Sequence, residues 1–301
     1  GVQIFTVDGD GNFVMNDEVP VSVPWELADL DGDGRLDIFG CNGVGDLLVY
    51  LYDGNLEAFA DPTIVAHFDN GYAPQFADMN GDGLLDLIVV SASGVADFFY
   101  PLVHLLPGLP DGDFGPPQLV TTAPDDYRSV CTADLDGDGR KDVVAAAYNR
   151  DQIEWFRNEG EGHFSSVHLV NFQASGDPAS HTIDVVAGDL DGDGDIDLVA
   201  TIDDGDGVYW LENDGTGNFG PPQSIPTGNN YSTPILADMD NDGDLDLLVS
   251  GTGVWLYTND GTGSFDAGVQ ITTASGDIST ADLDGDGDLD LIVANGSYLN
   301  Q

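Results

Sequence analysis

Short runs of aliphatic and β-branched residues recur along the chain, and polar, glycine-rich segments separate them. The clearest runs are 87–90, 143–145, 198–200, 247–249 and 291–293. Each run is too short for a helix, and its lack of polar residues predicts a strand that is buried on both faces. The pattern therefore predicts an all-β protein in which one such strand belongs to each of several repeats.

A polar segment of constant pattern precedes these strands. Counted from its first aspartate, acidic or amide side chains stand at positions 1, 3, 5 and 9, and glycine stands at position 6. The copies begin 44 to 56 residues apart, a spacing typical of propellers, solenoids and other repeat arrays. The six copies span 29–37, 78–86, 134–142, 189–197, 238–246 and 282–290.

The acidic pattern indicates a cation site in each copy. Four carboxylates within nine residues repel one another unless a cation lies among them. Oxygen donors at alternate positions suit Ca²⁺, and the glycine allows the sharp turn that brings both ends of the loop around an ion. An EF-hand is excluded because that motif needs Glu at position 12. Position 12 is occupied here by Gly40, Val89, Ala145, Ala200, Val249 and Val293.

The loops resemble the calcium loops of FG-GAP or VCBS repeats, which are the blades of integrin-α-like β-propellers. The sequence Phe-Gly-Pro-Pro at 114–117 and at 219–222 resembles the phrase that gives the repeat its name. This resemblance covers nearly the whole chain and implies up to six Ca²⁺ ions. Asn80 keeps an oxygen donor at position 3 of the second loop but lowers the local charge, so we expect weaker binding there.

The side-chain ligands expected at positions 1, 3, 5 and 9 are Asp29, Asp31, Asp33 and Asp37; Asp78, Asn80, Asp82 and Asp86; Asp134, Asp136, Asp138 and Asp142; Asp189, Asp191, Asp193 and Asp197; Asp238, Asp240, Asp242 and Asp246; and Asp282, Asp284, Asp286 and Asp290. The resemblance implies that the position 7 carbonyl completes each set, which corresponds to Arg35, Leu84, Arg140, Asp195, Asp244 and Asp288.

Each repeat is predicted to hold four strands, which make one propeller blade. The chain starts in the middle of a repeat, and its first 20 or so residues would supply the outer half that the last repeat lacks. We therefore expect residues 1–301 to form a single six-bladed β-propeller that is closed by strands from both termini. A seventh, incomplete blade that includes 297–301 is the alternative.

Three local features depart from the regular repeat. Residues 91–113 are rich in aromatics and leucine and are predicted to replace the third strand, as an extended hairpin or as a functional loop. Trp155 and Trp210 are predicted to pack against the next blade rather than to stack on sugars.

Five of the six basic residues fall in the third repeat, where ion pairing within the blade is favoured over a site for an anionic sugar or an acidic partner. These five are Arg128, Arg140, Lys141, Arg150 and Arg157.

Charge and cysteine content limit the classes of partner, the state of the thiols and the cellular location that we expect. The chain has 55 acidic and 6 basic residues and a net charge of −49, which excludes nucleic acid and anionic membranes as partners. Six bound Ca²⁺ ions would bring this charge to about −37. Cys41 and Cys131 lie in different repeats and are expected to be free, buried thiols. Weak surface calcium sites favour secretion to an extracellular or cell-surface address, and a start at Gly1 without methionine indicates a mature or trimmed product.

The sequence shows no nucleophile and base pair and no metal-ligand spacing among its five histidines, so no enzymatic activity is expected. We expect a calcium-binding adhesion or recognition module whose partner is a glycan or a cell-surface protein. One alternative is a structural subunit of a surface assembly or filament, which would self-assemble. The other is a polysaccharide lyase, for which Tyr127 and Arg128 are the nearest candidates for the base and its cationic neighbour.

Overall fold

The computed structural model describes fourteen stretches of the chain. They are 2–7, 13–19, 23–42, 44–53, 58–68, 70–92, 101–121, 126–150, 152–165, 167–170, 181–202, 207–227, 233–281 and 287–294. The chain divides into two compact units, of which one comprises 1–125 and 158–165 and the other 126–157 and 166–301. The two units are described separately.

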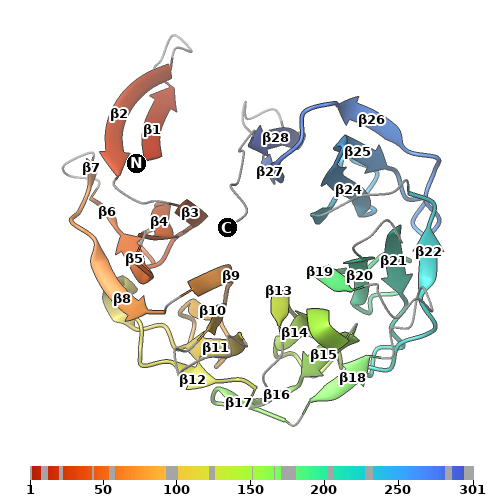
Figure 1. Ribbon diagram of the computed structural model, residues 1–301, viewed down its shortest axis with the longest axis horizontal. Coiled ribbons are helices and arrows are strands. Elements are labelled where there is room, and N and C mark those ends of the chain that lie inside the picture. The colour runs from red at the N-terminus through yellow and green to blue at the C-terminus, as the bar shows by residue number, and fades with distance from the viewer. Residues whose placement is uncertain are drawn as a thin grey trace. The chain divides into compact units, whose positions relative to one another are not determined.

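Five four-stranded antiparallel sheets, which we call blades 1 to 5, make up most of the structure (Figure 1). Apart from two short 3-10 helices, the described residues form no helix. No helix among them is long and apolar enough to cross a membrane. The blades are β3 (Val23–Ala28), β4 (Asp37–Cys41), β5 (Asp46–Tyr50) and β8 (Thr63–His67); β9 (Asn70–Ala77), β10 (Asp86–Ala92), β11 (Leu102–Leu106) and β12 (Gln118–Leu119); β13 (Tyr127–Ala133), β14 (Asp142–Ala147), β15 (Gln152–Phe156) and β18 (His168–Val170); β19 (Thr182–Gly188), β20 (Asp197–Ile202), β21 (Gly207–Leu211) and β22 (Gln223–Ile225); and β23 (Pro234–Ala237), β24 (Asp246–Gly251), β25 (Gly253–Tyr257) and β26 (Val269–Thr272).

Four two-stranded sheets complete the described strands. The pairs are β1 (Val2–Val7) with β2 (Phe13–Val19), β6 (Tyr52–Asp53) with β7 (Ala58–Phe59), β16 (Asn158–Gly160) with β17 (His163–Phe164), and β27 (Asp277–Ala281) with β28 (Asp290–Ala294). The closure of a ring by both termini and the count of six blades stay predictions.

The second strand of each blade is buried on both faces, as the sequence predicted, but the predicted run at 291–293 lies in β28, where Ile292 is 39% exposed. In β20 the side chains of Leu198 and Ala200 pack toward blade 3, whereas Val199, between them, packs toward blade 5. Successive strand residues point to opposite faces, so a central strand with a neighbouring blade on each side must be apolar at every position. This requirement explains the short, uninterrupted apolar runs in the sequence.

The first strands of consecutive blades lie side by side within a unit. In the second unit β13 lies beside β19 (Figure 1), and β19 lies beside β23; in the first unit β3 lies beside β9. Four-stranded sheets stacked face to face in chain order, with their first strands adjacent, are the arrangement of propeller blades. The fold is therefore all-β and propeller-like.

The third strand of the second repeat is present, which corrects the expectation that the insertion replaces it. Strand β11 pairs in regular antiparallel register with β10, from Leu87 opposite Leu106 to Ser91 opposite Leu102. The insertion lengthens the connection that leads into this strand, and 93–100 lie outside the described residues. The aromatic residues that precede β11 obscured its start, because the apolar pattern runs on without a break.

The predicted packing of the tryptophans against the next blade is confirmed for two of them. Trp155 is 5% exposed and Trp210 is 6% exposed. A Cβ added at Gly217 of blade 4 would lie 2.1 Å from the Trp155 ring, and one at Gly263 of blade 5 would lie 2.2 Å from the Trp210 ring. Glycine is required in these turns because the indole of the preceding blade occupies the space that a side chain would need. Trp255 is only half-buried.

An asparagine after the third strand joins blade 4 and blade 5 each to the blade before it. Asn213 donates hydrogen bonds from Nδ2 to the carbonyl of Leu135 in blade 3 (2.9 Å) and to that of Ile196 in its own blade (2.9 Å). Asn259 repeats both bonds, to the carbonyls of Leu190 (2.8 Å) and Leu245 (3.1 Å). These amides are buried, so the bonds are shielded from water.

The same bond occurs within the first unit. Asn158 Nδ2 donates to the carbonyl of Met79 at 2.6 Å. In all three cases the acceptor is position 2 of an acidic loop in the preceding blade. We call Asn158, Asn213 and Asn259 the latch asparagines.

Replacement of a latch asparagine should destabilise the protein strongly. Asn213→Ala leaves two carbonyls without their amide donor, and the N–H of Gly217 without the Asn213 Oδ1 that accepts it at 3.1 Å. We expect a loss of about 2–4 kcal/mol in the free energy of unfolding, since each unsatisfied buried group costs about 1–3 kcal/mol. Denaturant unfolding followed by tryptophan fluorescence measures this loss. The matched control is Asn218→Ala on the exposed side of the same turn, and equal stability of the two variants would contradict the assignment.

Candidate metal centres in the inter-strand loops

Each acidic loop connects the first and second strands of a blade. In the first blade Ala28, the last residue of β3, pairs with Asp37, the first residue of β4, and the loop closes between them. The same relation holds in the next four blades, where position 9 of the loop is the first residue of β10, β14, β20 or β24. The ends of the loop are thus fixed by the sheet, and the acidic side chains between them are held together.

The position 9 aspartate is a buried anchor in the first five loops, whereas Asp290 of the sixth loop is half-buried. Asp197 is 1% exposed, and its two oxygens accept hydrogen bonds from the backbone N–H of Leu190 at 3.2 Å and of Asn213 at 2.8 Å. Asp246 accepts from Met239 at 3.0 Å and from Asn259 at 2.9 Å in the same way. This carboxylate therefore ties the start of its loop to the turn after the third strand.

Burial opposes the charge on these anchors. It raises the pKa of Asp197 to about 6. Hydrogen bonds from two backbone N–H groups and from the side chain of Trp210 lower this pKa, and the charge of Asp191 raises it slightly. It is also the largest cause of the raised pKa values of Asp37, Asp86 and Asp246. A buried carboxylate without a counter-ion is disfavoured in its charged form, so a nearby cation would stabilise it.

Positions 1, 3 and 5 shape the rest of the loop. The position 1 carboxylate accepts from the N–H of the position 6 glycine, as in Asp189 with Gly194 at 3.0 Å. Position 3 accepts from the N–H of position 5, as in Asp191 with Asp193 at 3.3 Å. The glycine itself has φ +94°, a conformation that favours glycine. The position 1 bond recurs for Asp29, Asp78, Asp134 and Asp238.

These bonds bring carboxylate oxygens of one loop to a common centre. Oxygens that all lie within 4.8 Å of one another come from Asp29, Asp31 and Asp33 in the first loop; from Asp134, Asp136 and Asp142 in the third; from Asp189, Asp191 and Asp197 in the fourth; and from Asp238, Asp240 and Asp246 in the fifth. Clusters of hard oxygen donors of this kind suit Ca²⁺, and they do not suit the softer metals that prefer sulfur or nitrogen.

Two further observations fit a hard cation in these loops. Asp29 Oδ1 is buried and has no hydrogen-bond partner among the described residues. The pKa of Asp244 is raised by desolvation and then by the charges of Asp242, Asp238 and Asp240. An unpaired buried oxygen and mutually repelling carboxylates are both relieved by a cation. The donor set therefore fits the metal that the sequence pattern implies.

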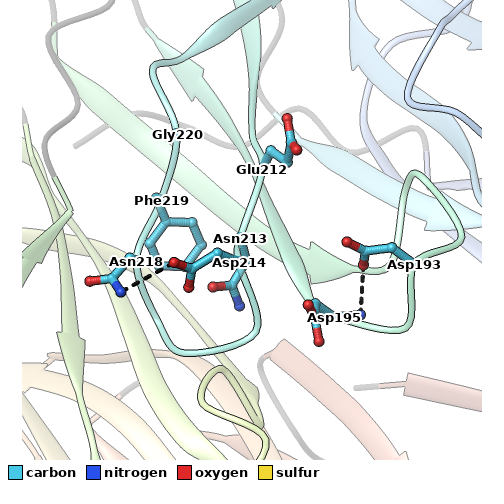
Figure 2. Close-up of a pocket in the computed structure, with 8 residues that line it drawn as sticks. All are labelled: Asp193, Asp195, Glu212, Asn213, Asp214, Asn218, Phe219 and Gly220. Atoms are coloured by element: carbon cyan, nitrogen blue, oxygen red, sulfur yellow. Dashed lines mark hydrogen bonds between the residues drawn. The ribbon is translucent and has the colours of Figure 1, made fainter.

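An open acidic hollow of about 530 Å³ adjoins the fourth loop. Figure 2 shows Asp193 and Asp195 on the loop, with Glu212 and Asp214 on the segment that faces it. Asn218 and Thr216 donate to Asp214, and the bond from Thr216 is the largest cause of the lowered pKa of that carboxyl. The hollow is continuous with the loop and extends its negative surface toward solvent.

The arginines of the third repeat pair with acidic residues of the same blade, as predicted. Arg157 contacts Asp136 through Nε and Asp138 through Nη2, the latter at 3.0 Å. Arg140 also pairs with Asp138, so two guanidinium groups meet positions 3 and 5 of the third loop. Arg128 pairs with Asp126 at 2.5 Å, and Arg150 with Glu154 at 2.7 Å.

Other predicted residues are placed as follows. Cys41 and Cys131 are free, as expected; Cys131 is buried and Cys41 is half-buried. Tyr127 is fully buried and donates to Glu154 at 2.6 Å, so the Tyr127 and Arg128 pair does not face an open cleft as a lyase site would require.

The second and sixth loops differ from the others. Asn80 takes part in the second loop through Nδ2, which donates to Asp86 at 3.3 Å. In the sixth loop Asp288 and Asp290 are described, whereas Asp282, Asp284 and Asp286 lie outside the described residues. The predicted ligand sets of these two loops stay predictions.

Sequence reasoning missed the role of two groups that support the loops. The recurrence of Asn158 and Asn213 three residues after a tryptophan is visible in the sequence, but their hydrogen bonds to an earlier loop are not. Arg35 pairs with Asp33 as Arg140 pairs with Asp138, so arginine at position 7 reaches back to position 5 of its own loop. The expectation for position 7 concerned only its carbonyl.

The fold and the loops define a propeller-like repeat protein with clustered acidic sites. The model of the FG-GAP-like repeat matches residues 29–89, 134–200, 189–249 and 250–293, which together make up well over half of the chain. The chain belongs to the FG-GAP-like repeat family. Comparison with curated proteins gives no significant match.

Solved structures with a similar fold include a lectin. A lectin of Agrocybe aegerita, described as recognising non-reducing terminal N-acetylglucosamine, superposes with a TM-score of 0.65 at 23% identity, over 91% of this chain and 75% of that one. The biofilm matrix protein Bap1 of V. cholerae gives a TM-score of 0.42 at 20% identity, over 85% of this chain and 41% of that one. The likeness to the lectin shows the shared fold.

The raised pKa values predict the pH dependence of the metal-free protein. The pKa of Asp197 in the folded state is about 6, above that of an unfolded Asp at about 3.9, so the folded state binds this proton more tightly. The resulting stabilisation is complete below the unfolded value and is lost as the pH rises through the folded value. The thermal unfolding midpoint of metal-stripped protein should therefore fall between about pH 4 and pH 7. A midpoint that rises over this interval in calcium-free buffer would contradict the assignment of buried, uncompensated carboxylates.

Proposed function

We propose that this protein is a secreted, calcium-stabilised recognition module that binds glycans or glycosylated surface proteins and has no catalytic activity of its own. The observation that carries the proposal is the repetition of one carboxylate arrangement in successive loops, each joining the first two strands of a blade. A repeated site of this kind serves the stability of the whole array.

Calcium would be held by the side chains at positions 1, 3, 5 and 9 of each loop. When bound, it supplies positive charge that offsets the repulsion between these carboxylates, and it adds stability according to its free concentration. The protein contributes the rest: the position 9 anchor fixes the loop ends, and the position 6 glycine gives the turn its shape. Sites of modest affinity would be filled at extracellular calcium levels, which supports secretion.

The recognition surface would lie in hollows at the junctions between blades. One hollow of about 350 Å³ is lined by Trp155 and His168 of blade 3 and by Thr216 and Asn218 of blade 4. Its counterpart between blades 4 and 5 has a volume of about 230 Å³ and is lined by Trp210 among others. Trp155 and Trp210 are almost fully buried, so the polar groups that line the hollows, rather than ring stacking, would hold a small ligand such as a sugar. The fold shared with a lectin supports a glycan over other ligands of this size.

Removal of calcium should lower stability. Each site filled at a hundredfold excess over its dissociation constant adds about 2.7 kcal/mol to the free energy of unfolding. Differential scanning calorimetry with calcium and with excess chelator should therefore show a large fall of the unfolding midpoint in chelator. Magnesium at equal concentration is the control, and it should restore less because it prefers to keep several of its waters. A midpoint that is the same in calcium and in chelator would refute the structural role.

Glycan binding is tested directly with the full chain on a glycan array in millimolar calcium. We expect a restricted set of glycans to be retained and to be released by the matching free sugar. Retention should weaken when calcium is removed, because the hollows lie between blades that the loops hold in place. Absence of binding to every glycan in calcium would contradict the proposed function.

A further inference from the structure

The two hollows between blades are equivalent in construction. Trp155 pairs with His168 across strands β15 and β18, and Trp210 pairs with Gln223 across β21 and β22. Each tryptophan is covered by a glycine of the next blade's turn. The strand register thus places the same elements around both hollows, and differences between them come from single side chains. We call them the 3–4 hollow, with Trp155, and the 4–5 hollow, with Trp210.

The charge at the mouth is the main difference. Two residues after each tryptophan stands Arg157 in blade 3 and Glu212 in blade 4. Arg157 lines the 3–4 hollow, together with His168 and Asp136. Glu212 lines the acidic hollow beside the fourth loop instead, and Gln223, which lines the 4–5 hollow, donates to it at 3.3 Å. One position of the repeat therefore carries opposite charge in two adjacent blades, and no basic residue lines the 4–5 hollow.

Arg157 is held in place and still offers hydrogen-bond donors. Its Nη2 donates to Asp138 at 3.0 Å, and its Nε lies against Asp136 without a hydrogen bond; no hydrogen bond from Nη1 is found among the described residues. The side chain is 42% exposed. A guanidinium presents five N–H donors in a planar fork that matches a carboxylate, so the donors that face away from the loop are available to a ligand. The two aspartates fix the direction of this fork.

We propose that the 3–4 hollow selects a sugar that bears a carboxylate, such as a uronic acid residue, and that Arg157 is the residue that determines this specificity. The 4–5 hollow takes an uncharged sugar, because no basic residue lines it. This inference rests on the proposed function, which assigns the hollows to glycans, and it deepens that function by naming the sugar class. In an otherwise strongly acidic protein, local positive charge is needed to admit an anion.

Cation binding in the third loop would strengthen this selectivity. Asp136 and Asp138 offset the charge of Arg157 in the structure, and both are predicted ligands of the third loop. A divalent cation bound by those carboxylates would offset their charge in turn, so that the guanidinium attracts the ligand's carboxylate more strongly. The 3–4 hollow and the third loop would then act together.

The test compares one oligosaccharide in two forms. The full chain in millimolar calcium is titrated calorimetrically with a glucuronate-containing oligosaccharide, and then with the same oligosaccharide after reduction of its carboxyl groups to alcohols. We expect the carboxylate form to bind at least about tenfold more tightly, since hydrogen bonds to charged groups are the stronger ones. The preference should shrink as the salt concentration rises.

Three variants assign the preference to its residue. Arg157→Gln should remove the preference for the carboxylate form, and it should change the affinity for the reduced form much less. Arg157→Lys keeps the charge but loses the planar fork, so it should retain part of the preference. Glu212→Gln is the matched control at the equivalent position of blade 4, and it should not diminish the preference. The unfolding midpoint of each variant shows that it is folded.

The outcomes separate failure of this inference from failure of the proposed function. Equal binding of both forms by the wild-type protein, or a preference that survives in folded Arg157→Gln, overturns this inference and leaves the glycan-binding function intact. If neither form binds, and no glycan binds on the array either, the proposed function fails together with the inference. Loss of the preference in Arg157→Gln with its retention in Glu212→Gln supports the assignment.

Discussion

A buried carboxylate at the start of each second strand is the constraint on which the structure depends. Asp197 and its equivalents lie where the sheet excludes water. Each accepts a hydrogen bond from a backbone N–H of its own loop, and Asp197 accepts a second from Asn213 in the turn after the third strand. A buried anion is tolerated only with hydrogen bonds and nearby positive charge. The backbone supplies the hydrogen bonds, and the neighbouring carboxylates create the need for a cation.

The latch asparagines extend this local arrangement from one blade to the next. The carbonyl that accepts from Asn213 belongs to Leu135 in the acidic loop of blade 3. The N–H of Leu135 donates to Asp142, the position 9 anchor of that same loop. A loop that loosens would therefore release both its own blade and the turn that follows. Hydrogen-bond networks of this kind couple their members, so we expect neighbouring loops to influence one another's stability. The tryptophan and glycine contacts add apolar burial at the same junctions.

The sequence was most informative where the chemistry is local. The acidic pattern and the apolar run that follows lie within about a dozen residues, and both the loops and the buried second strands were predicted correctly from them. The third strand of the second repeat was misread because aromatic residues next to it hide its first residue. Partners distant in sequence were out of reach: Asn213 and Leu135 are 78 residues apart, and only the stacking of blades brings them together. The pairing of Arg157 with Asp136 and Asp138 was expected only as ion pairing within the blade, without its partners.

Cation binding in the loops is the central claim, and anomalous diffraction tests it most directly. Crystals grown in millimolar calcium and measured at a long wavelength give density peaks specific for calcium, independent of any effect on stability. The account predicts one peak among the carboxylates of each loop, including Asp29, Asp31 and Asp33 in the first loop. Ordered loops that show no anomalous peak under these conditions would contradict it.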